Sequence, residues 1–429
     1  MAEDSDNDRG DRIAQLVSRG AGLVIIAGGI YAFGAITALS NSWPWSSLTN
    51  SISIVSSLIR DGEVIPPGRR VPAPAGAATE RVTIHSPDAA MGDGYYALLA
   101  WDVGAGHYGL FLHDAAGELL HTIPIDERSF DDRAEHNSNA PHAMEMLSDG
   151  SVLVSFDWLG SVARLDACGA PVWLREGYYH HSFAPSADGG MWTWYGEGSA
   201  YGQIQDILKF DPLTGDDMVR ISFTEDVIMR DAGTALAYSF LPGYAFTPDD
   251  ADPRDIFHPN DAEELMPEMA AAFPMFEAGD LMLSIRELDL VTVIDPETGE
   301  TKWSQQGPWL KQHDPDFLPD GTISVYNNSR FRPNSSIIVM DPKTRTVSNP
   351  IPGLKVPFKS AYRGKHQYLP NGNILITIPE QGQALEVVPG GEVALEFNNP
   401  AAKEGYNEDV VNAKWLPSDF FDTLPSCSG

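Results

Sequence analysis

Four histidines occupy similar places in the chain, each shortly before a glycine-containing turn and an alternating apolar strand. They are His142 before Gly150, His181 before Gly189, His313 before Gly321 and His366 before Gly372. Neutral imidazole is nucleophilic, and its ordinary pKa near ~6.5 keeps it mostly neutral at physiological pH. A second imidazole can protonate a departing phenoxide, and a cation such as Arg286 can hold the oxygens of a transferred group. Histidines delivered to equivalent places in several copies of one unit therefore suggest a site that transfers an anionic group.

Two other uses of these histidines stay open. Imidazoles can cap strands by hydrogen bonding to neighbouring backbone, and clustered histidines also bind metal ions. Because no HxH or HExxH pattern and no carboxylate-rich partner accompanies them, we predict no metal ligand and no cofactor. His180 and His181 are adjacent, and adjacent side chains of a strand point to opposite faces, so only one of the two is expected in the pocket. The register shared with His142 and His313 favours His181.

The elements that must position the histidines are short strands in a repeated two-part phrase. One part is an Asp-Gly or Asn-Gly turn followed by an alternating strand, as in GSVLVSF, GTISVYN and GNILITI. The other part is an apolar strand ending in Asp, a turn with Gly and a further strand, as in VTVIDPETGETKW. Apolar runs of period two on both sides of each turn are typical of β-hairpins.

Six copies of this phrase can be counted, with a period of roughly 40 residues. They cover residues 94–125, 142–177, 180–223, 277–307, 312–353 and 364–400. Several short strands per unit and few helical patterns predict an all-β fold, a six-bladed β-propeller over residues 90–400. Segment 224–276 is longer than a blade connection needs to be, so we expect a loop insertion with a helix at Glu263–Ala272. Because ligands bind where the innermost strands surround the channel, the four histidines are expected around one pocket.

Residues 20–39 carry no charge and are long enough to cross a ~30 Å hydrocarbon core as a helix. Arg9, Arg12 and Arg19 precede this segment, and no Lys or Arg follows it until Arg60. The positive-inside rule then predicts a cytoplasmic N-terminus and an exported remainder. We therefore expect a single-pass protein of the inner (plasma) membrane with its propeller on the periplasmic side.

A cleavable signal peptide is the alternative to a retained anchor, with Ala38 and Ser40 as small residues at a cleavage site. The apolar stretch is longer than a usual signal core, which favours the anchor. The expected order is a cytoplasmic tail at 1–19, the anchor at 20–39, a juxtamembrane segment and linker at 40–89, the propeller at 90–400 and a C-terminal tail at 401–429.

The net charge and the cysteine content reduce the number of possible partners and site types. The formal net charge of −32 argues against nucleic acid as a partner, because a polyanion would be repelled. The two cysteines, Cys168 and Cys427, are not spaced like a zinc site or a redox CxxC motif. Two alternatives stay open for an exported domain. The cysteines either form a disulfide that pins the C-terminal tail to a blade or remain two unpaired thiols.

Several runs of sequence resemble the bacterial arylsulfotransferase (aryl-sulfate sulfotransferase) family. They are FHPNDAEEL at 257–265, FEAGDLMLSIRELDLVTVIDPETGETKW at 276–303, QHDPDFLPDGTISVYNN at 312–328 and LPNGNILIT at 369–377. The resemblance implies a six-bladed propeller in the periplasm. It also implies sulfuryl transfer from a phenolic sulfate ester to another phenol without a nucleotide sulfate donor, through a transiently sulfated channel histidine. The implied partners are thus a small-molecule aryl sulfate and a phenol.

The resemblance assigns the nucleophile and the group that faces it. The family's Gln-His motif falls on Gln312 and His313, so His313 is the candidate nucleophile. Its His-x-Asn motif falls on His258 and Asn260, so His258 would hold or protonate the ester oxygen. Its Ser-x-Arg strand ends at Arg286, which would clamp the sulfuryl group.

The remaining candidate residues are matched less closely. The family's double histidine falls on His180 and His181, one of which would line the pocket. His142 and His366 match no catalytic role of the family. We expect them to bind substrate, together with the Asn260 and Gln312 side chains.

Two departures from the family pattern make donor and acceptor uncertain. His258 and Arg286 lie 28 residues apart, farther than is usual, so 261–276 is interpreted as an insertion. The usual Asp-Asn pair after the nucleophile's strand reads Asn327-Asn328. The alternatives are a non-catalytic binding or scaffold propeller in a membrane complex and a metal-dependent hydrolase or lactonase. A homodimer and a partner in such a complex both stay open.

Overall fold

The computed structural model describes residues 69–134, 140–157, 159–198, 205–230, 257–330, 332–351 and 354–427. The chain divides into two compact units at Arg69–Arg70, and nearly all described residues belong to the second unit. The predicted anchor at 20–39 lies outside the described residues. Within the described ranges, no helix has the length and apolar character needed to span a membrane.

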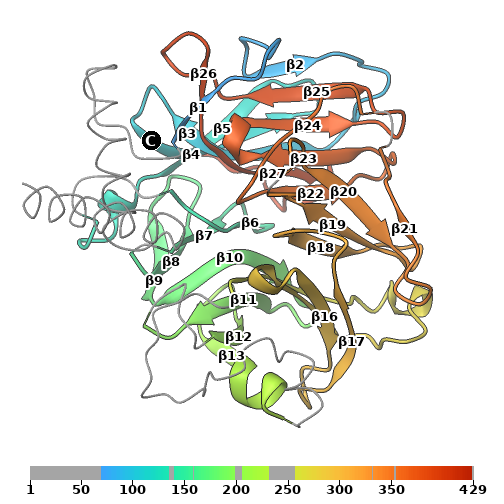
Figure 1. The fold of residues 1–429 in the computed structure, drawn as a ribbon. Helices are drawn as coiled ribbons and strands as arrows, with labels where there is room; N and C mark the ends of the chain where they lie inside the picture. Colours follow the sequence, from blue (N-terminus) through green and yellow to red (C-terminus); the bar gives the residue numbers. More distant parts are fainter. Residues whose placement is uncertain are drawn as a thin grey trace, which may run out of the picture. The chain divides into compact units, whose positions relative to one another are not determined.

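Six antiparallel sheets of four or five strands form the blades of the second unit, which confirms the six-bladed β-propeller (Figure 1). The first two blades, from the innermost strand outward, are β27 (Val410–Leu416), β3 (Tyr95–Asp102), β4 (His107–Asp114), β5 (Leu119–Ile125), and β6 (Met144–Met146), β7 (Val152–Phe156), β8 (Ser161–Leu165), β9 (Pro171–Glu176). The third and fourth are β10 (Tyr178–Pro185), β11 (Met191–Gly196), β12 (Gln205–Phe210), β13 (Asp217–Ser222), and β14 (Pro259–Glu264), β15 (Leu281–Ile285), β16 (Leu290–Ile294), β17 (Thr301–Gln306). The fifth and sixth are β18 (His313–Phe317), β19 (Ile323–Asn327), β20 (Ser336–Met340), β21 (Val347–Ser348), and β22 (Lys365–Tyr368), β23 (Ile374–Ile378), β24 (Gln383–Val387), β25 (Val393–Asn398).

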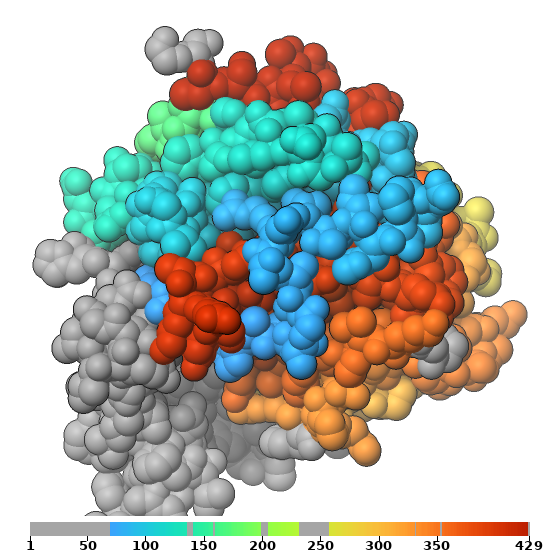
Figure 2. All heavy atoms as spheres, turned by 90° about the horizontal axis from the view of Figure 1, so that it is seen from above, coloured from blue at the N-terminus to red at the C-terminus, as the bar shows by residue number. Residues whose placement is uncertain are grey.

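The two ends of the propeller sequence close the ring. β27 pairs with β3, while β2 (Val82–Ile84) adds a fifth strand to the sixth blade beside β25. β1 (Arg70–Pro72) pairs with β26 (Tyr406–Glu408), so early and late parts of the chain lie side by side (Figure 2). A disulfide joins Cys168, in the turn between β8 and β9, to Cys427. Of the two cysteine states left open by the sequence, the disulfide is the one found.

Tight turns and apolar layers give each blade its shape. The glycines that follow the four histidines, Gly150, Gly189, Gly321 and Gly372, have φ of 83°, 87°, 84° and 85°, which glycine adopts without a steric penalty. Every residue of β7, β19 and β23 is buried, because each sheet is covered on both faces by its neighbours. The helical segments are short: η1 (Glu127–Ser129), η2 (Phe223–Ile228), η3 (Ala270–Ala272), η4 (Arg286–Leu288) and η5 (Pro379–Gln381).

Three sequence predictions about element boundaries differ from the structure. The helix predicted at Glu263–Ala272 is absent, since its first residues end β14 and its last ones form the short η3. β14, the innermost strand of the fourth blade, falls in the segment expected to be a loop insertion. Its sequence PNDAEE lacks apolar alternation because one face of an innermost strand lines the polar channel. The expected C-terminal tail contains β27, whose partner strand lies at the other end of the sequence.

Candidate active site

Four histidines from four consecutive blades converge at one end of the innermost strands. His142 precedes β6, His181 lies in β10, His258 directly precedes β14, and His313 begins β18. The ring of His181 is central, with centroids 4.2 Å from His142, 4.8 Å from His258 and 6.2 Å from His313. The sequence repeat alone predicted three members of this cluster, and His258 was found only through the family resemblance.

Irregular backbone delivers two of these side chains. His181 and His258 have φ of 68° and 45°, in the left-handed region that non-glycine residues seldom adopt. The strand register shifts between His180 and Ala184 and again between Pro259 and Asp261. Such residues cost on the order of 1–3 kcal/mol each and concentrate at functional sites. The bulge at His181 breaks the strict alternation of β10, so that His181 enters the cluster while the ring of His180 lies next to it at 2.7 Å between their Nδ1 atoms.

His313 is a neutral imidazole, and one of its ring nitrogens is hydrogen-bonded to the protein. Its Nδ1 lies 2.8 Å from Oδ1 of Asn328. Among the described residues, the buried Nε2 has no hydrogen-bond partner. Burial, and next the charge of Arg286, lower the pKa of His313 to about 3. The ring is therefore neutral at physiological pH and carries a lone pair on Nε2.

The Asn328 side chain can present only its oxygen to His313. Its Nδ2 donates to the carbonyl oxygens of Ser360 and Arg363, each at 2.9 Å. The amide is fully buried, which fixes its orientation. An amide oxygen accepts hydrogen bonds only, so the proton of His313 must sit on Nδ1. Sequence reasoning noted Asn328 only as part of the departure from the family pattern.

Arg286 lies against His258. Its NH1 donates to His258 Nε2 at 2.6 Å, and its NH2 contacts Glu287 Oε1 at 2.7 Å. Glu287 is also paired with Lys311 Nζ at 2.9 Å, which holds the guanidinium end in place. Burial and then the Arg286 charge keep the pKa of His258 well below its ordinary value. The site thus contains one fixed cation beside neutral imidazoles, a suitable environment for an anionic group.

His180 and His181 occupy different depths. His181 lines the central cavity, whereas His180 is fully buried behind it. His180 Nε2 lies 2.8 Å from Oε1 of Gln205, and its Nδ1 lies 2.7 Å from Nδ1 of His181. Burial lowers the pKa of His180 to about 4 and that of His181 well below its ordinary value. Gln205, in QDILKF, carries no sequence signal that could have marked it.

A carboxylate holds the ring of His142 in its place in the cluster. Its Nδ1 is bonded to Oδ2 of Asp157, which is almost fully buried. Asp157 follows β7 directly, at the end of the repeated turn-and-strand phrase. An imidazole that donates from Nδ1 to a carboxylate keeps a fixed orientation and tautomer. The substrate-binding role expected for His142 stays a prediction.

Gln312 and Asn260 tie neighbouring blades together. Gln312 Nε2 lies 3.1 Å from Ser284 Oγ and 2.9 Å from the Leu290 carbonyl oxygen. Asn260 Nδ2 donates to the Gln312 carbonyl oxygen at 2.7 Å. The buried oxygens Asn260 Oδ1 and Gln312 Oε1 have no hydrogen-bond partner among the described residues. Both side chains therefore have a clear positioning role, and each keeps one acceptor atom.

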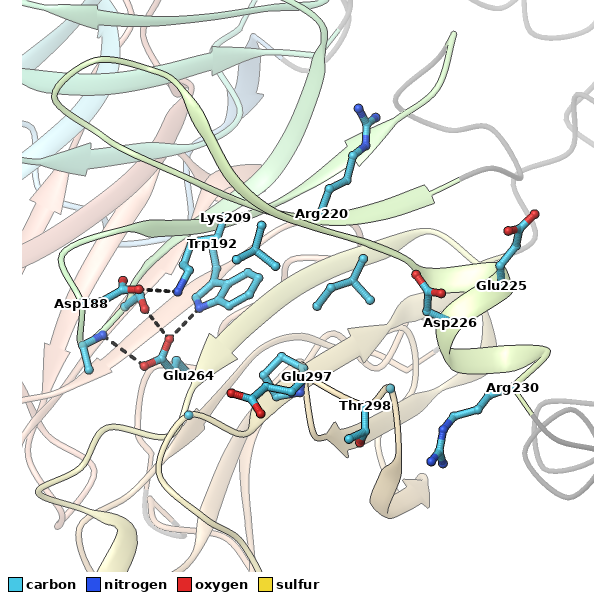
Figure 3. A pocket seen from close by; sticks show the side chains of 17 residues that line it. Asp188, Trp192, Lys209, Arg220, Glu225, Asp226, Arg230, Glu264, Glu297 and Thr298 are labelled. Atoms are coloured by element: carbon cyan, nitrogen blue, oxygen red, sulfur yellow. Dashed lines mark hydrogen bonds and ion pairs between the residues drawn. The ribbon is translucent and has the colours of Figure 1, made fainter.

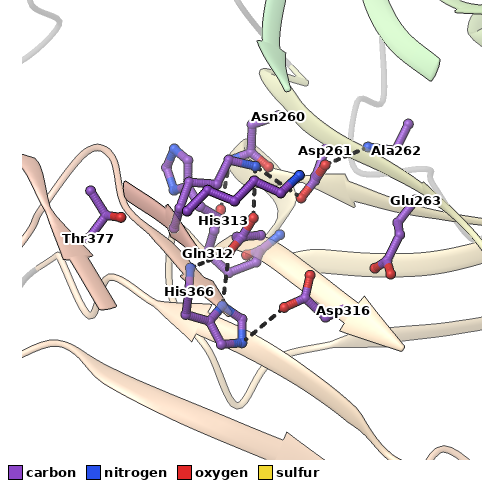
Figure 4. A network of polar contacts seen from close by, with 12 residues as sticks. Asn260, Asp261, Ala262, Glu263, Gln312, His313, Asp316, His366 and Thr377 are labelled. Atoms are coloured by element: carbon purple, nitrogen blue, oxygen red, sulfur yellow. Dashed lines mark hydrogen bonds and ion pairs between the residues drawn. The ribbon is translucent and has the colours of Figure 1, made fainter. Parts of the chain in front are cut away.

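His366 does not join the imidazole cluster. It lies beside β18 in a network of carboxylates, where its Nδ1 is 2.9 Å from Asp314 Oδ2 and its Nε2 is 3.4 Å from Asp316 Oδ2 (Figure 4). Burial opposes protonation, but Asp316 and Asp314 together raise its pKa. His181 and His366 line the same central cavity, but His366 lies among carboxylates and outside the imidazole cluster. Its expected role in substrate binding stays a prediction.

The network around His366 lines the central channel. A cavity of 720 Å³ reaches from His181 past residues of all six innermost strands. Its wall carries the acidic residues Glu145, Asp261, Glu263, Asp314 and Asp316, together with Lys365 and Lys414. Burial raises the pKa of Asp261, Glu263 and Asp316. In contrast, Lys365 and His366 outweigh burial at Asp314 and lower its pKa.

A second cavity of 880 Å³ lies between the third and fourth blades (Figure 3). None of the predicted site residues lines it. Its buried carboxylate, Glu264, already accepts from Trp192 Nε1 at 2.7 Å and from Ser186 Oγ at 2.5 Å. This cleft therefore contains a satisfied structural contact and lacks the nucleophile and cation of the histidine cluster.

Among the residues that the structure describes, two groups of side chains have donor atoms near enough to one another to surround a metal ion. They are His142, Asp157 and His181, and Asp314, Asp316 and His366. In the acidic group, Lys365 Nζ lies 2.7 Å from Asp314 Oδ1 and already supplies a cation. In the other group, Asp157 is already bonded to the His142 ring. These contacts describe ion-paired networks of the protein itself, and we assign a metal to neither.

Comparison with known proteins gives one family. A family model described as "Arylsulfotransferase (ASST)" matches residues 143–400, more than half of the chain. No curated protein matches the chain. Among solved structures, it is similar to a protein of unknown function from Bacteroides caccae, with 12% identity over 75% of this chain and 99% of that chain and a TM-score of 0.48. It is also similar to TolB from Acinetobacter baumannii, with 14% identity over 76% of this chain and 69% of that chain and a TM-score of 0.43.

Proposed function

The chain belongs to the arylsulfotransferase family, and we propose that it transfers a sulfuryl group from an aryl sulfate ester to a phenol through His313. The observation that carries this proposal is the state of the His313 ring. Nδ1 is bound to Asn328, and the buried Nε2 has no partner among the described residues. A neutral, buried imidazole with one oriented lone pair is a competent nucleophile.

We infer that Arg286 and His258 hold the sulfuryl oxygens during transfer. Transfer of such a group is catalysed mainly by positioning and by charge placed around its oxygens, as in phosphoryl transfer. The Arg286 guanidinium supplies a permanent positive charge, and Glu287 orients it. His258 is held against this guanidinium at 2.6 Å, so the two side chains act together as one clamp.

The proposed cycle has two half-reactions. In the first, His313 Nε2 attacks sulfur, an S–N bond forms, and the S–O bond to the aryl group breaks. The aryl oxide leaves with the electron pair of that bond and takes up a proton. In the second, the oxygen of the acceptor phenol attacks sulfur as it loses its proton, and the S–N bond breaks. The pair returns to Nε2, so no cofactor or nucleotide donor is consumed.

We further propose that the propeller works outside the cytoplasm on an anchored chain. The charge-free segment 20–39 and the arginines before it support a single-pass inner-membrane anchor with a periplasmic propeller. The Cys168–Cys427 disulfide is in keeping with an oxidising compartment. Small aryl sulfates and phenols of that compartment would then be its substrates.

Turnover with a chromogenic aryl sulfate tests this function. The exported domain is incubated with 4-nitrophenyl sulfate and a phenol acceptor, and both nitrophenol release and the sulfated acceptor are measured. We expect stoichiometric transfer that His313→Ala abolishes. Exposed His85→Ala provides a matched control and should keep full activity. A folded protein without transfer over a broad donor panel would instead indicate a binding or scaffold propeller.

A further inference from the structure

A line of five side chains runs from the third blade to the sulfuryl clamp. Oε1 of Gln205 lies 2.8 Å from Nε2 of His180, and Nδ1 of His180 lies 2.7 Å from Nδ1 of His181. On the far side, Nε2 of His181 lies 3.1 Å from Nε2 of His258, which also receives NH1 of Arg286 at 2.6 Å. Every contact between the three imidazoles is between two nitrogens. The positions of the protons therefore decide whether each contact is a hydrogen bond.

The protons can be assigned from the Gln205 end. An amide oxygen accepts only, so His180 carries its proton on Nε2. Burial lowers the pKa of His180 to about 4, which leaves its Nδ1 as an acceptor near neutral pH. His181 must then donate from Nδ1. A neutral His181 consequently has a lone pair on Nε2, the atom that faces His258.

The protons can also be assigned from the Arg286 end. A guanidinium group only donates, so His258 Nε2 accepts from Arg286. When both imidazoles are neutral, the Nε2 atoms of His181 and His258 thus face each other as two acceptors at 3.1 Å. One proton on His181 Nε2 would turn this contact into a hydrogen bond.

We infer that His181 takes up one proton when an anionic substrate binds and acts as the acid and base of the reaction, with Gln205 and His180 as positioning residues. The catalytic part of this inference rests on the proposed sulfuryl transfer. In the first half-reaction, protonated His181 gives its Nε2 proton to the departing aryl oxide while the S–O bond breaks. In the second, His181 Nε2 takes the proton of the acceptor phenol as its oxygen attacks sulfur and the S–N bond breaks. The proton is therefore returned once per cycle.

The surroundings of His181 explain why the proton should arrive with the substrate. Among the described residues, the titratable and charged groups around it are His142 with Asp157, His180, His258 with Arg286, His313, and in the channel Asp261 and Lys365. Burial and the neighbouring imidazoles keep His181 unprotonated when no anion is bound. A sulfate ester adds a negative charge to this buried site, which favours the imidazolium. Because His258 Nε2 already accepts from Arg286, the added proton is expected on Nε2 of His181, which faces it at 3.1 Å.

Proton uptake on binding can be measured without turnover. Benzenesulfonate is a suitable probe because its C–S bond cannot transfer a sulfuryl group. Its binding to the exported domain is followed by calorimetry at pH 7.5 in phosphate and in Tris, whose ionisation heats differ. We expect uptake of about one proton per bound sulfonate, because the bound state holds one more proton than the free state. Gln205→Glu should retain this uptake, since a carboxylate still accepts from His180.

Gln205→Leu should lose most of the uptake. Without an acceptor at position 205, His180 can donate from Nδ1, and a neutral His181 can then donate to His258. Gln306→Leu, an exposed glutamine of the fourth blade, is the matched control and should bind sulfonate with unchanged uptake. Binding heats that do not depend on the buffer in the unsubstituted protein would overturn the inference, as would full uptake in a folded Gln205→Leu variant.

The outcomes also separate this inference from the proposed function. If sulfonate binds with uptake of one proton but no aryl sulfate is turned over, proton uptake by His181 is supported and sulfuryl transfer is refuted. Turnover with no proton uptake refutes the role of His181 alone. Failure to bind sulfonate at all overturns both. If Gln205→Leu does not fold, the buffer dependence of the unsubstituted protein and of Gln205→Glu still decides the question.

Discussion

Nδ1 of His313 donates a hydrogen bond of 2.8 Å to Oδ1 of Asn328, and this contact determines which ring nitrogen can react. Two carbonyl groups hold the Asn328 amide from the other side. The lone pair of the imidazole is thereby confined to Nε2, inside the cluster of His181, His258 and Arg286. The proposed nucleophile is thus prepared by a residue that directly follows β19, the second strand of the same blade.

Replacing Asn328 by alanine should slow transfer while leaving substrate binding nearly intact. Loss of a buried hydrogen bond of about 1–3 kcal/mol corresponds to a decrease in kcat of roughly 5- to 150-fold. Steady-state kinetics separate this effect from a change in KM. Asn327→Ala is the matched control, since that side chain bonds Leu310, Ser329 and Ser336 and should lower stability more than kcat. Equal effects of both substitutions on kcat would contradict the role given to Asn328.

Arg286→Lys should be a severe substitution although it keeps the charge. Lysine cannot contact His258 and Glu287 at once as the planar guanidinium does. Removing such a fixed donor from a transition state costs about 100- to 1,000-fold in rate, and kcat/KM for the aryl sulfate measures it. Arg128→Lys, at an exposed ion pair with Asp126, should have no effect. Near-normal kcat/KM in Arg286→Lys would show that the clamp lies elsewhere.

Acid should destabilise the fold through the buried imidazoles. The pKa of His313 falls from 6.5 to about 3 on folding, so between these values the unfolded chain binds a proton that the native protein does not. Stability therefore rises with pH across this window and levels off above about 6.5. Urea unfolding at pH 5 and 7.5 should show a smaller stability difference for His313→Asn than for the unsubstituted protein. An unchanged difference would mean that His313 is not buried as a neutral ring.

The disulfide should contribute substantially to ring closure. Cys168 and Cys427 lie 259 residues apart in sequence, and a cross-link across a long loop stabilises by about 2–5 kcal/mol. Reducing agent should lower the midpoint of thermal unfolding of the exported domain. The Cys168→Ser variant should already show the lower midpoint and should not respond further. A response of that variant to reductant would place the effect outside this bond.

The fold was predictable because its signal repeats. Glycine turns such as the one at Gly321 recur with apolar strands at a regular period, and the structure has a blade at each predicted unit. Strand β14 and strand β27 were missed for different reasons. β14 is polar because it faces the channel, and β27 pairs with a strand from the other end of the sequence. Both are innermost strands, where function and ring closure override the local pattern.

The candidate site was predictable only in part. His142, His181 and His313 follow from the repeat, but His366 shares their spacing and lies instead among carboxylates. Spacing does not determine which way a side chain leaves a bulged strand. The sequence marked Asn328 only as a departure from the family pattern and did not mark Gln205, because the importance of each comes from one atom placed by tertiary packing.

The central claim is that the sulfuryl group passes through Nε2 of His313, and trapping that adduct tests it most directly. The exported domain is mixed with excess 4-nitrophenyl sulfate in the absence of acceptor, denatured at alkaline pH and digested, and the peptides are analysed by mass spectrometry. The account predicts one added SO₃ group on the peptide that contains His313, formed with a burst of one nitrophenol per protein and discharged by phenol. A burst with the adduct on another residue, or phenol-dependent turnover with no adduct at all, would contradict it.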